Sequence, residues 1–242
     1  MFKGTILCVP RSDAIRHAAA YLSELGISVT DKCAPDVRHL LLPVPSFTAG
    51  DEYLAYYLSR LPDDVVITGG NLHSPLLRGY RTVDFLQDPY YLASNAAITA
   101  DCALEILNDH FDSPLEGKQA LILGWGRIGK CLGKLLEHQG VRVSISARKA
   151  SDLAMIQALE YRALPMADLS ACTGSFDMIL NTVPSLVLPD ADTKSSAFIM
   201  ELASQPGITG PNILIARGLP GKMAPERSGK LIAETFIRLS LS

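Results

Sequence analysis

The 242-residue chain lacks the features that mark several large classes of protein. It has no long basic run, and its formal net charge of −3 argues against nucleic acid as a main partner. No apolar stretch approaches the roughly 18 residues of a membrane span, and the N-terminus enters a strand without a secretory signal. We therefore expect no nucleic-acid partner, no membrane association and a cytoplasmic location.

Disulfide and metal patterns are missing as well. The five cysteines are an odd number and include no C-x-x-C pair, which favours reduced thiols in a cytosol. Most of them lie in apolar surroundings, so buried packing is expected and no metal site is predicted. What the chain does have is 48% hydrophobic and 19% charged residues, the composition of a globular protein with ample core.

Apolar runs and amphipathic stretches alternate along the chain, which favours parallel sheets in an α/β fold. We predict two doubly wound, Rossmann-like domains with a cofactor in the cleft between them. Residues 1–94 form a flavodoxin- or Rossmann-like substrate domain, 95–114 a connecting helix, and 115–242 a dinucleotide-binding domain that includes a C-terminal helix. Expected strands are Gly4–Val9, Ile27–Thr30, His39–Pro43, Val65–Thr68, Thr82–Phe85, Gln119–Leu123, Val141–Ser146, Met178–Asn181, Phe198–Glu201 and Ile213–Ala216.

One glycine-rich segment has the setting of a dinucleotide-binding loop. Gly124, Gly126 and Gly129 form G-x-G-x-x-G directly after the apolar run Ala120–Leu123 and before an amphipathic segment. The glycines provide a tight turn, backbone approach to a pyrophosphate and close helix–strand packing, while N–H groups at the helix N-terminus hold the phosphates. The other predicted cofactor contacts of this loop are Trp125, Arg127 and Ile128.

The residues after the second strand of this unit indicate which dinucleotide is bound. Where NAD binders place an Asp or Glu, the chain reads Ala147-Arg148-Lys149. An acid would hold the ribose hydroxyls, whereas two cations suit a 2′-phosphate, so we predict NADP. Solvated surface charges are the alternative reading of this pair. The opening turn of the first domain, Val9–Asp13, contains no glycine, so one cofactor site is expected rather than two.

Ligands of a doubly wound sheet lie beyond the carboxyl ends of its strands. This rule places the segment after Met178–Asn181 at the same rim, with Asn181, Thr182, Val183 and Pro184 along the ribose and nicotinamide. Glu201 ends the next strand and could accept or relay a proton, so Glu201 and Asn181 are the catalytic candidates. An ordinary turn and a capping carboxylate are the structural alternatives.

Four further segments, taken with the glycine loop, carry a family resemblance. They are Leu42–Gly50, Asn181–Ser185, Glu201–Gly207 and Gly218–Gly229, the last reading GLPGKMAPERSG. Together they resemble the family formed by the A subunit of dipicolinate synthase. The likeness runs through residues 115–240 with little interruption and more loosely through residues 1–114.

The resemblance implies an NADP-dependent Rossmann subunit that acts with a smaller, flavoprotein-like second subunit. That pair makes pyridine-2,6-dicarboxylate in sporulating bacteria, so the substrate implied here is a cyclic dihydro- or tetrahydrodipicolinate-type dicarboxylate. A homodimer is also possible. From the same likeness and from strand-end positions, Ser46, Thr48, Gly221 and Lys222 are the expected substrate contacts, with Arg227 as a further cation. Arg217 is another candidate cation, although it is not a residue of the family pattern.

Several positions depart from the family pattern. The first turn has Pro10-Arg11 where glycines are common, Asp101 stands where the family has a longer acid, and Glu201 where it has Asp. These departures and the lack of a histidine at the rim favour an alternative, a non-catalytic NADP(H)-binding protein that regulates a partner. A dehydrogenase of another small amino or hydroxy acid is a second alternative.

Overall fold

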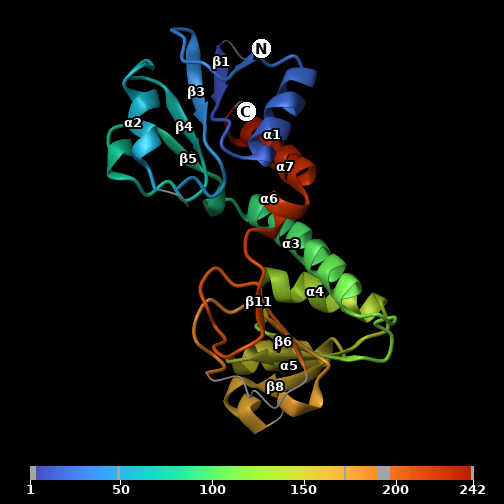
Figure 1. Ribbon diagram of the computed structural model, residues 1–242. Coiled ribbons are helices and arrows are strands. Elements are labelled where there is room, and N and C mark those ends of the chain that lie inside the picture. The colour runs from blue at the N-terminus through green and yellow to red at the C-terminus, as the bar shows by residue number, and fades with distance from the viewer. Residues whose placement is uncertain (1–3, 48–49, 172, 190–196, 241–242) are drawn as a thin grey trace. The chain divides into compact units, whose positions relative to one another are not determined.

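The computed structural model describes residues 4–47, 50–171, 173–189 and 197–240. The chain forms two compact units, one made of Met1–Asn95 with Pro220–Ser242 and the other of Ala96–Leu219 (Figure 1). The boundary near residue 95 agrees with the predicted end of the first domain. The assignment of the C-terminal helix to the second domain was wrong, because that helix belongs to the first unit.

The sheet of the first unit has five parallel strands in the order β2-β1-β3-β4-β5. This is the flavodoxin-like order, in which the chain direction across the sheet reverses between β1 and β3. All five agree with predicted strands, with bounds that shift by one or two residues. They are β1 (Thr5–Cys8), β2 (Val29–Thr30), β3 (Val37–Leu41), β4 (Val66–Gly69) and β5 (Thr82–Asp84).

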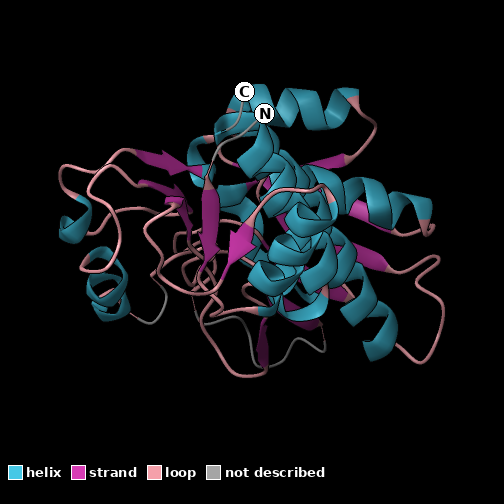
Figure 2. Cartoon of the chain, turned by 90° about the horizontal axis from the view of Figure 1, so that it is seen from above, coloured by secondary structure: helices cyan, strands magenta, loops and turns pink. Residues whose placement is uncertain are grey.

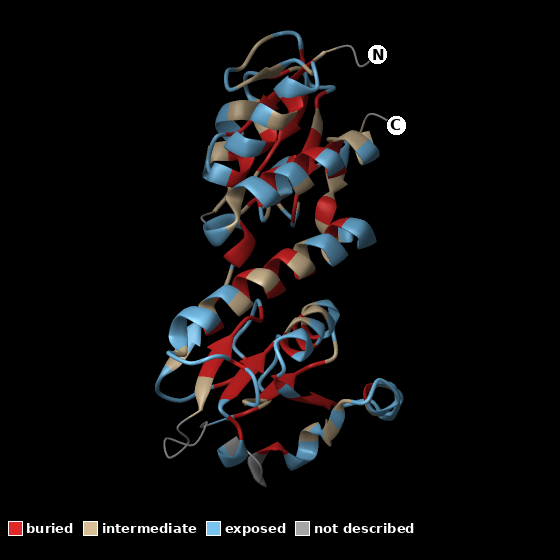
Figure 3. Cartoon of the chain, turned by 90° about the vertical axis from the view of Figure 1, so that its right-hand side faces the viewer, coloured by how far each residue is buried: buried red, intermediate tan, exposed pale blue. Residues whose placement is uncertain are grey.

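Both faces of this sheet are covered. Side chains alternate along β1, so Ile6 and Cys8 join one apolar cluster while Leu7 and Val9 join another. Helices α1 (Asp13–Glu24) and α7 (Pro225–Ser240) pack in the first cluster, and α2 (Glu52–Leu58) packs in the second. Figure 3 shows the strands mainly as buried and the outer helix faces as exposed.

The contact between α7 and α1 explains why the last helix belongs to the first unit. Ile232 and Phe236 of α7 are buried with Ile15 of α1 in one cluster. Gly229 lies so close to α1 that an added Cβ would stand 2.5 Å from the carbonyl oxygen of Ala14. The sequence pattern identifies the apolar face of this helix, but a face does not specify the surface on which it packs.

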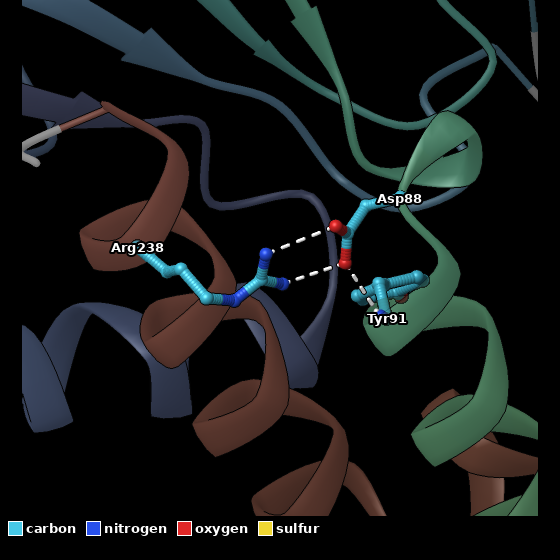
Figure 4. A network of polar contacts seen from close by, with 3 residues as sticks. All are labelled: Asp88, Tyr91 and Arg238. Atoms are coloured by element: carbon cyan, nitrogen blue, oxygen red, sulfur yellow. Dashed lines mark hydrogen bonds and ion pairs between the residues drawn. The ribbon is translucent and has the colours of Figure 1, made fainter.

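A second link ties α7 to the start of α3 (Pro89–His110), within the same unit (Figure 4). Asp88 precedes the helix and accepts a hydrogen bond from the backbone N–H of Tyr91 at 2.7 Å. Arg238 donates from both terminal nitrogens to the two carboxylate oxygens of Asp88, at 2.9 and 2.6 Å. These hydrogen bonds hold the pKa of Asp88 below its usual value.

The sheet of the second unit has six parallel strands in the order β11-β10-β9-β6-β7-β8. This is the strand order of the Rossmann fold, with its reversal between β6 and β9. The predicted fold class of two parallel-sheet α/β units is confirmed. The strands are β6 (Gln119–Leu123), β7 (Arg142–Ala147), β8 (Arg162–Pro165), β9 (Met178–Asn181), β10 (Phe198–Glu201) and β11 (Ile213–Ile215).

Two α-helices join strands of this sheet; Figure 2 colours helices cyan and strands magenta. Helix α4 (Arg127–His138) joins β6 to β7, and α5 (Ala150–Ala158) joins β7 to β8. Short helical turns follow, including η3 (Met166–Ala171), and α6 (Leu219–Met223) stands where the chain passes between the units. Within the described ranges, no helix is both long and apolar enough to cross a bilayer.

Candidate functional site

A pocket of about 280 Å³ lies at the carboxyl ends of β6, β7 and β9, next to the reversal point of the second sheet. Ligands of open α/β sheets bind at this position. The lining includes most of the predicted cofactor contacts, and Asp152 and Met166 in addition. The lining residues are Gly124, Trp125, Gly126, Ala147, Arg148, Lys149, Asp152, Met166, Thr182, Val183 and Pro184.

The three glycines of the loop have different geometries. Gly124 has a φ of +104°, a conformation that favours glycine. A Cβ on Gly129 would stand 2.2 Å from the carbonyl oxygen of Gly124, so close packing of helix on loop requires glycine there. A Cβ on Gly126 would have no heavy atom of the described residues within 4 Å. Gly124 and Gly129 are thus required by the turn and by close packing, whereas Gly126 has open space beside it.

The start of α4 differs from the equivalent point of the first unit. Gly126 is the N-cap of α4, and no side chain of the described residues caps it. In the first unit, the hydroxyl of Ser12 accepts a hydrogen bond from the N–H of Ile15 at 3.3 Å at the start of α1. The first N–H groups of a helix need partners. Those of α1 have a side-chain cap, whereas the N-cap residue of α4 provides none.

The residues that follow β7 contribute positively charged side chains to the pocket lining. Arg148 and Lys149 follow this strand directly, and both are exposed. Lys149 is also the N-cap of α5 and, like Gly126, makes no side-chain cap bond. Asp152 in the first turn of α5 brings one carboxylate to the same pocket. Its place three residues after Lys149 is the sequence signal that could have identified it, had α5 been predicted.

Asn181 and Glu201 lie side by side at the ends of β9 and β10, where they are paired in register. The side-chain nitrogen of Asn181 donates to both carboxylate oxygens of Glu201, at 2.8 and 2.9 Å. The backbone N–H groups of Ala203, Gly207 and Ile208 donate to the same carboxylate at 2.9, 2.8 and 3.2 Å. Glu201 is therefore a buried anion whose charge is met by five donated hydrogen bonds.

This network reaches the pocket wall. The side-chain oxygen of Asn181 accepts a hydrogen bond from the N–H of Val183 at 3.0 Å, and Val183 lines the pocket. Gly207 packs so closely that an added Cβ would stand 2.3 Å from the side-chain nitrogen of Asn181. Both Glu201 and Asn181 have no exposed surface. These contacts favour a positioning role for the two residues and give no support to a proton relay through Glu201.

The residues expected to contact the substrate, unlike most of those expected to contact the cofactor, do not line one described pocket. Ser46 is buried; its hydroxyl donates to the carbonyl of Pro43 at 2.8 Å and accepts from the N–H of Gly70 at 3.2 Å. These contacts give it a turn-stabilising role within the first unit. Gly221 and Lys222 are exposed in α6, and Thr48 lies outside the described residues. Their contact with a substrate stays a prediction, as does the cleft between the domains.

Solved structures that match this fold include a transhydrogenase and an L-alanine dehydrogenase. A transhydrogenase from Sinorhizobium meliloti matches with a TM-score of 0.68 and 13% identity over 89% of this chain and 77% of that one. An L-alanine dehydrogenase matches with a TM-score of 0.62 and 12% identity over 89% and 74% of the two chains. The chain thus shares its fold with these two proteins.

A more specific likeness is found in both sequence and fold. Over 156 residues the chain is 29% identical to the A subunit of dipicolinate synthase from Bacillus subtilis (strain 168), an alignment that covers 60% of this chain. It spans about half of that curated relative, 52% of its length. The crystal structure of the same subunit from Bacillus halodurans matches 98% of both chains with a TM-score of 0.81 and 20% identity. No protein-family model matches the chain. The chain therefore resembles the A subunit of dipicolinate synthase.

Proposed function

We propose that the chain binds NADP at the reversal point of its second sheet and acts as an oxidoreductase. The proposed reaction is the oxidation of a cyclic dihydro- or tetrahydrodipicolinate-type dicarboxylate to dipicolinate. The observation that carries the proposal is the pocket beside Gly126. No atom of the described residues fills the open side of this glycine, and two cations, Arg148 and Lys149, form part of the lining. The likeness to a dipicolinate synthase supports the choice of substrate.

Each part of the pocket suits one part of the dinucleotide. The uncapped start of α4 and the open side of Gly126 would hold the pyrophosphate. Arg148 and Lys149 would hold the 2′-phosphate through charge-assisted hydrogen bonds, and Thr182, Val183 and Pro184 would bound the opposite side. When bound, NADP supplies the acceptor for a hydride.

Loss of one hydride to NADP and one proton to solvent converts a dihydrodipicolinate into the aromatic product, and formation of this ring favours the step, so a strong acid–base pair of the protein is not required. A tetrahydrodipicolinate would need two such oxidations and two molecules of NADP. The buried state of Glu201 agrees with a site that lacks such an acid–base pair. The same observation favours the second candidate function, a non-catalytic NADP(H)-binding protein that regulates a partner. Since the curated relative is named as one subunit of a synthase, a second, flavoprotein-like subunit is part of the proposal, and a homodimer is a further possibility.

Exchange of Arg148 for Asp tests the cofactor assignment. Loss of one charge-assisted contact costs ~1.5–3 kcal/mol, or roughly 10–100-fold in affinity. Calorimetric titration should show that NADP binding weakens by that factor while NAD binding is kept or improved. Arg142→Asp is the matched control, because Arg142 is an exposed arginine at the opposite end of the same strand. Tighter binding of NAD than of NADP by the wild-type chain would contradict the assignment.

Turnover distinguishes the two candidate functions. The purified chain is mixed with NADP and enzymatically generated dihydrodipicolinate, with and without the proposed flavoprotein-like second subunit. Absorbance of NADPH and of pyridine-2,6-dicarboxylate is followed. Production of both in a 1:1 ratio supports the oxidoreductase. Tight NADP binding with no turnover in either mixture would support the regulatory role.

A further inference from the structure

A further cation, Arg217, lies at the carboxyl edge of the Rossmann sheet, outside the pocket lining described above. Arg217 follows β11, and its Nε donates to the carbonyl oxygen of Ala203 at 2.9 Å. Its Nη2 is buried and has no hydrogen-bond partner in the part of the chain that the structure describes. A buried charged donor without an acceptor is unfavourable, so this nitrogen marks a place where an acceptor is needed.

The strand register places Arg217 at the carboxyl end of the sheet, the same end as the proposed cofactor pocket. Glu201 of β10 pairs with Asn181 of β9 on one side and with Ile215 of β11 on the other. Adjacent strands lie about 4.8 Å apart, so the backbones at Asn181 and Ile215 are on the order of 10 Å apart. Two residues beyond these positions the chain reaches Val183, which lines the pocket, and Arg217.

The same buried carboxylate fixes both segments. Glu201 accepts from the N–H of Ala203 at 2.9 Å, and the carbonyl of Ala203 in turn accepts from Arg217. Glu201 also holds Asn181, whose side chain orients Val183. The guanidinium and the pocket wall therefore have a common support within one unit. A cation held in this way loses little conformational freedom when it binds an anion.

We propose that Arg217 binds a carboxylate group of a small dicarboxylate substrate, with Nη2 as a donor. The guanidinium suits this role because it can donate two parallel hydrogen bonds to a carboxylate. This inference rests on the proposed function for the identity of the substrate, since a dicarboxylate requires cations at the rim. It assigns to Arg217 a role that neither the glycine loop nor the charges after β7 provide.

The test uses the full-length chain and pyridine-2,6-dicarboxylate as the probe, measured by calorimetry with and without NADP. Arg217→Met keeps an unbranched, flexible side chain and removes the guanidinium with its charge. We expect Arg217→Met to weaken binding of the probe by roughly 10–100-fold, the equivalent of one charge-assisted contact. Affinity for NADP should stay the same. Arg217→Lys keeps the charge and should retain part of the affinity, and Arg162→Met, an exposed arginine in β8, is the matched control.

Two further measurements separate this proposal from others. Because Arg217→Met also removes the hydrogen bond from Nε to Ala203, its ligand-free unfolding midpoint measures the structural contribution of Arg217 separately; a lower midpoint together with unchanged binding of the probe would mark a purely structural arginine and overturn the proposal. Inorganic phosphate and pyridine-2,6-dicarboxamide are the comparison probes; equal competition by phosphate would indicate a general anion site and overturn the carboxylate assignment. Wild-type chain that binds NADP but not the dicarboxylate, or variants that bind it unchanged, would also overturn it. Failure to bind NADP alone would reject the proposed function and leave the carboxylate measurement valid.

Discussion

One side-chain nitrogen of Asn181 donates to both carboxylate oxygens of Glu201, at 2.8 and 2.9 Å, where two neighbouring strands end. The carboxylate accepts three backbone N–H groups from the segment that follows it. A buried charge is tolerated only when it is hydrogen-bonded in this way. The pair thus fixes two loops at the rim where the proposed cofactor binds.

Glu201→Gln should destabilise the chain although it changes the side chain by a single group. In the Gln variant an NH2 group replaces one carboxylate oxygen and faces N–H donors of Gly207, Ala203 or Asn181. Each buried donor left without an acceptor costs about 1–3 kcal/mol. Urea unfolding at neutral pH should show a loss of that size. Because Val183 loses its fixed neighbour, NADP affinity should fall as well. Glu105→Gln, at an exposed position of α3, is the control and should change stability by less than about 0.5 kcal/mol.

Two alanine substitutions in one loop should have opposite effects. Gly126→Ala adds a methyl group where no described atom lies within 4 Å, so the ligand-free chain should keep its stability and lose dinucleotide binding. Gly129→Ala adds one 2.2 Å from the carbonyl oxygen of Gly124 and should cost about 1–3 kcal/mol. Thermal unfolding and calorimetric titration measure the two effects. Retained dinucleotide binding by Gly126→Ala would show that the open space is not used.

His39 should make the first unit sensitive to acid. Its ring packs edge-on against Phe236 at 5.2 Å between centroids, and burial together with nearby Arg81 lowers the pKa of His39 to about 4. In the unfolded chain His39 has its ordinary pKa near 6.5 and is protonated below that pH, whereas in the folded chain it stays neutral down to about pH 4. Stability therefore falls as pH drops from 6.5 to 4, by at most about 3 kcal/mol at 1.36 kcal/mol per unit.

Unfolding by urea between pH 7 and pH 4 measures this effect. The variant His39→Gln should lose most of the pH dependence, since it has no group that titrates in this window. His73→Gln replaces a histidine outside the buried core and should keep it. If both variants follow the wild-type profile, the carboxylates and not His39 cause the acid sensitivity.

The ion pair of Asp88 and Arg238 should contribute modestly to stability. The side chain of Arg238 is 40% exposed, so water screens the pair and its contribution is about 0.5–1 kcal/mol. Asp88→Asn keeps a side-chain acceptor for the N–H of Tyr91 and removes the charge, whereas Asp88→Ala removes both and should cost about 1 kcal/mol more. The lowered pKa of Asp88 means that the ion-pair contribution is present above its ordinary pKa and is lost as pH falls through the folded value. Equal stability of the two variants at pH 7 would contradict the capping role.

Buried strands bounded by turns could be predicted closely from the sequence. The bounds of β6, β9 and β10 agree with the expected ones to the residue, because each is a short apolar run that both faces of the sheet bury. The edge strand β8 was missed, since its residues are exposed or half-buried and give no apolar signal. Helix α5 was missed for a related reason, as Ile156 alone of its residues is buried.

The site could be predicted only in part. The spacing of Gly124, Gly126 and Gly129 and the charges of Arg148 and Lys149 are local features of the sequence, and these residues meet at one pocket or support its loop. The role of Glu201 depends on the register between β9 and β10 and on the path of the following loop. A carboxylate at a strand end looks the same in the sequence whether it faces a ligand or, like Glu201, accepts five hydrogen bonds from its own chain.

The discontinuity of the first unit has a consequence for synthesis on the ribosome. Domains generally fold as units, N-terminal ones first, but the core of this unit includes Ile232 and Phe236 of α7. Residues 1–95 must therefore wait, with part of their apolar surface uncovered, until the chain has been extended past residue 236. All residues of the second unit, Ala96–Leu219, have been added before that point. The Rossmann unit is thus the first that can complete its core, although it comes second in the sequence.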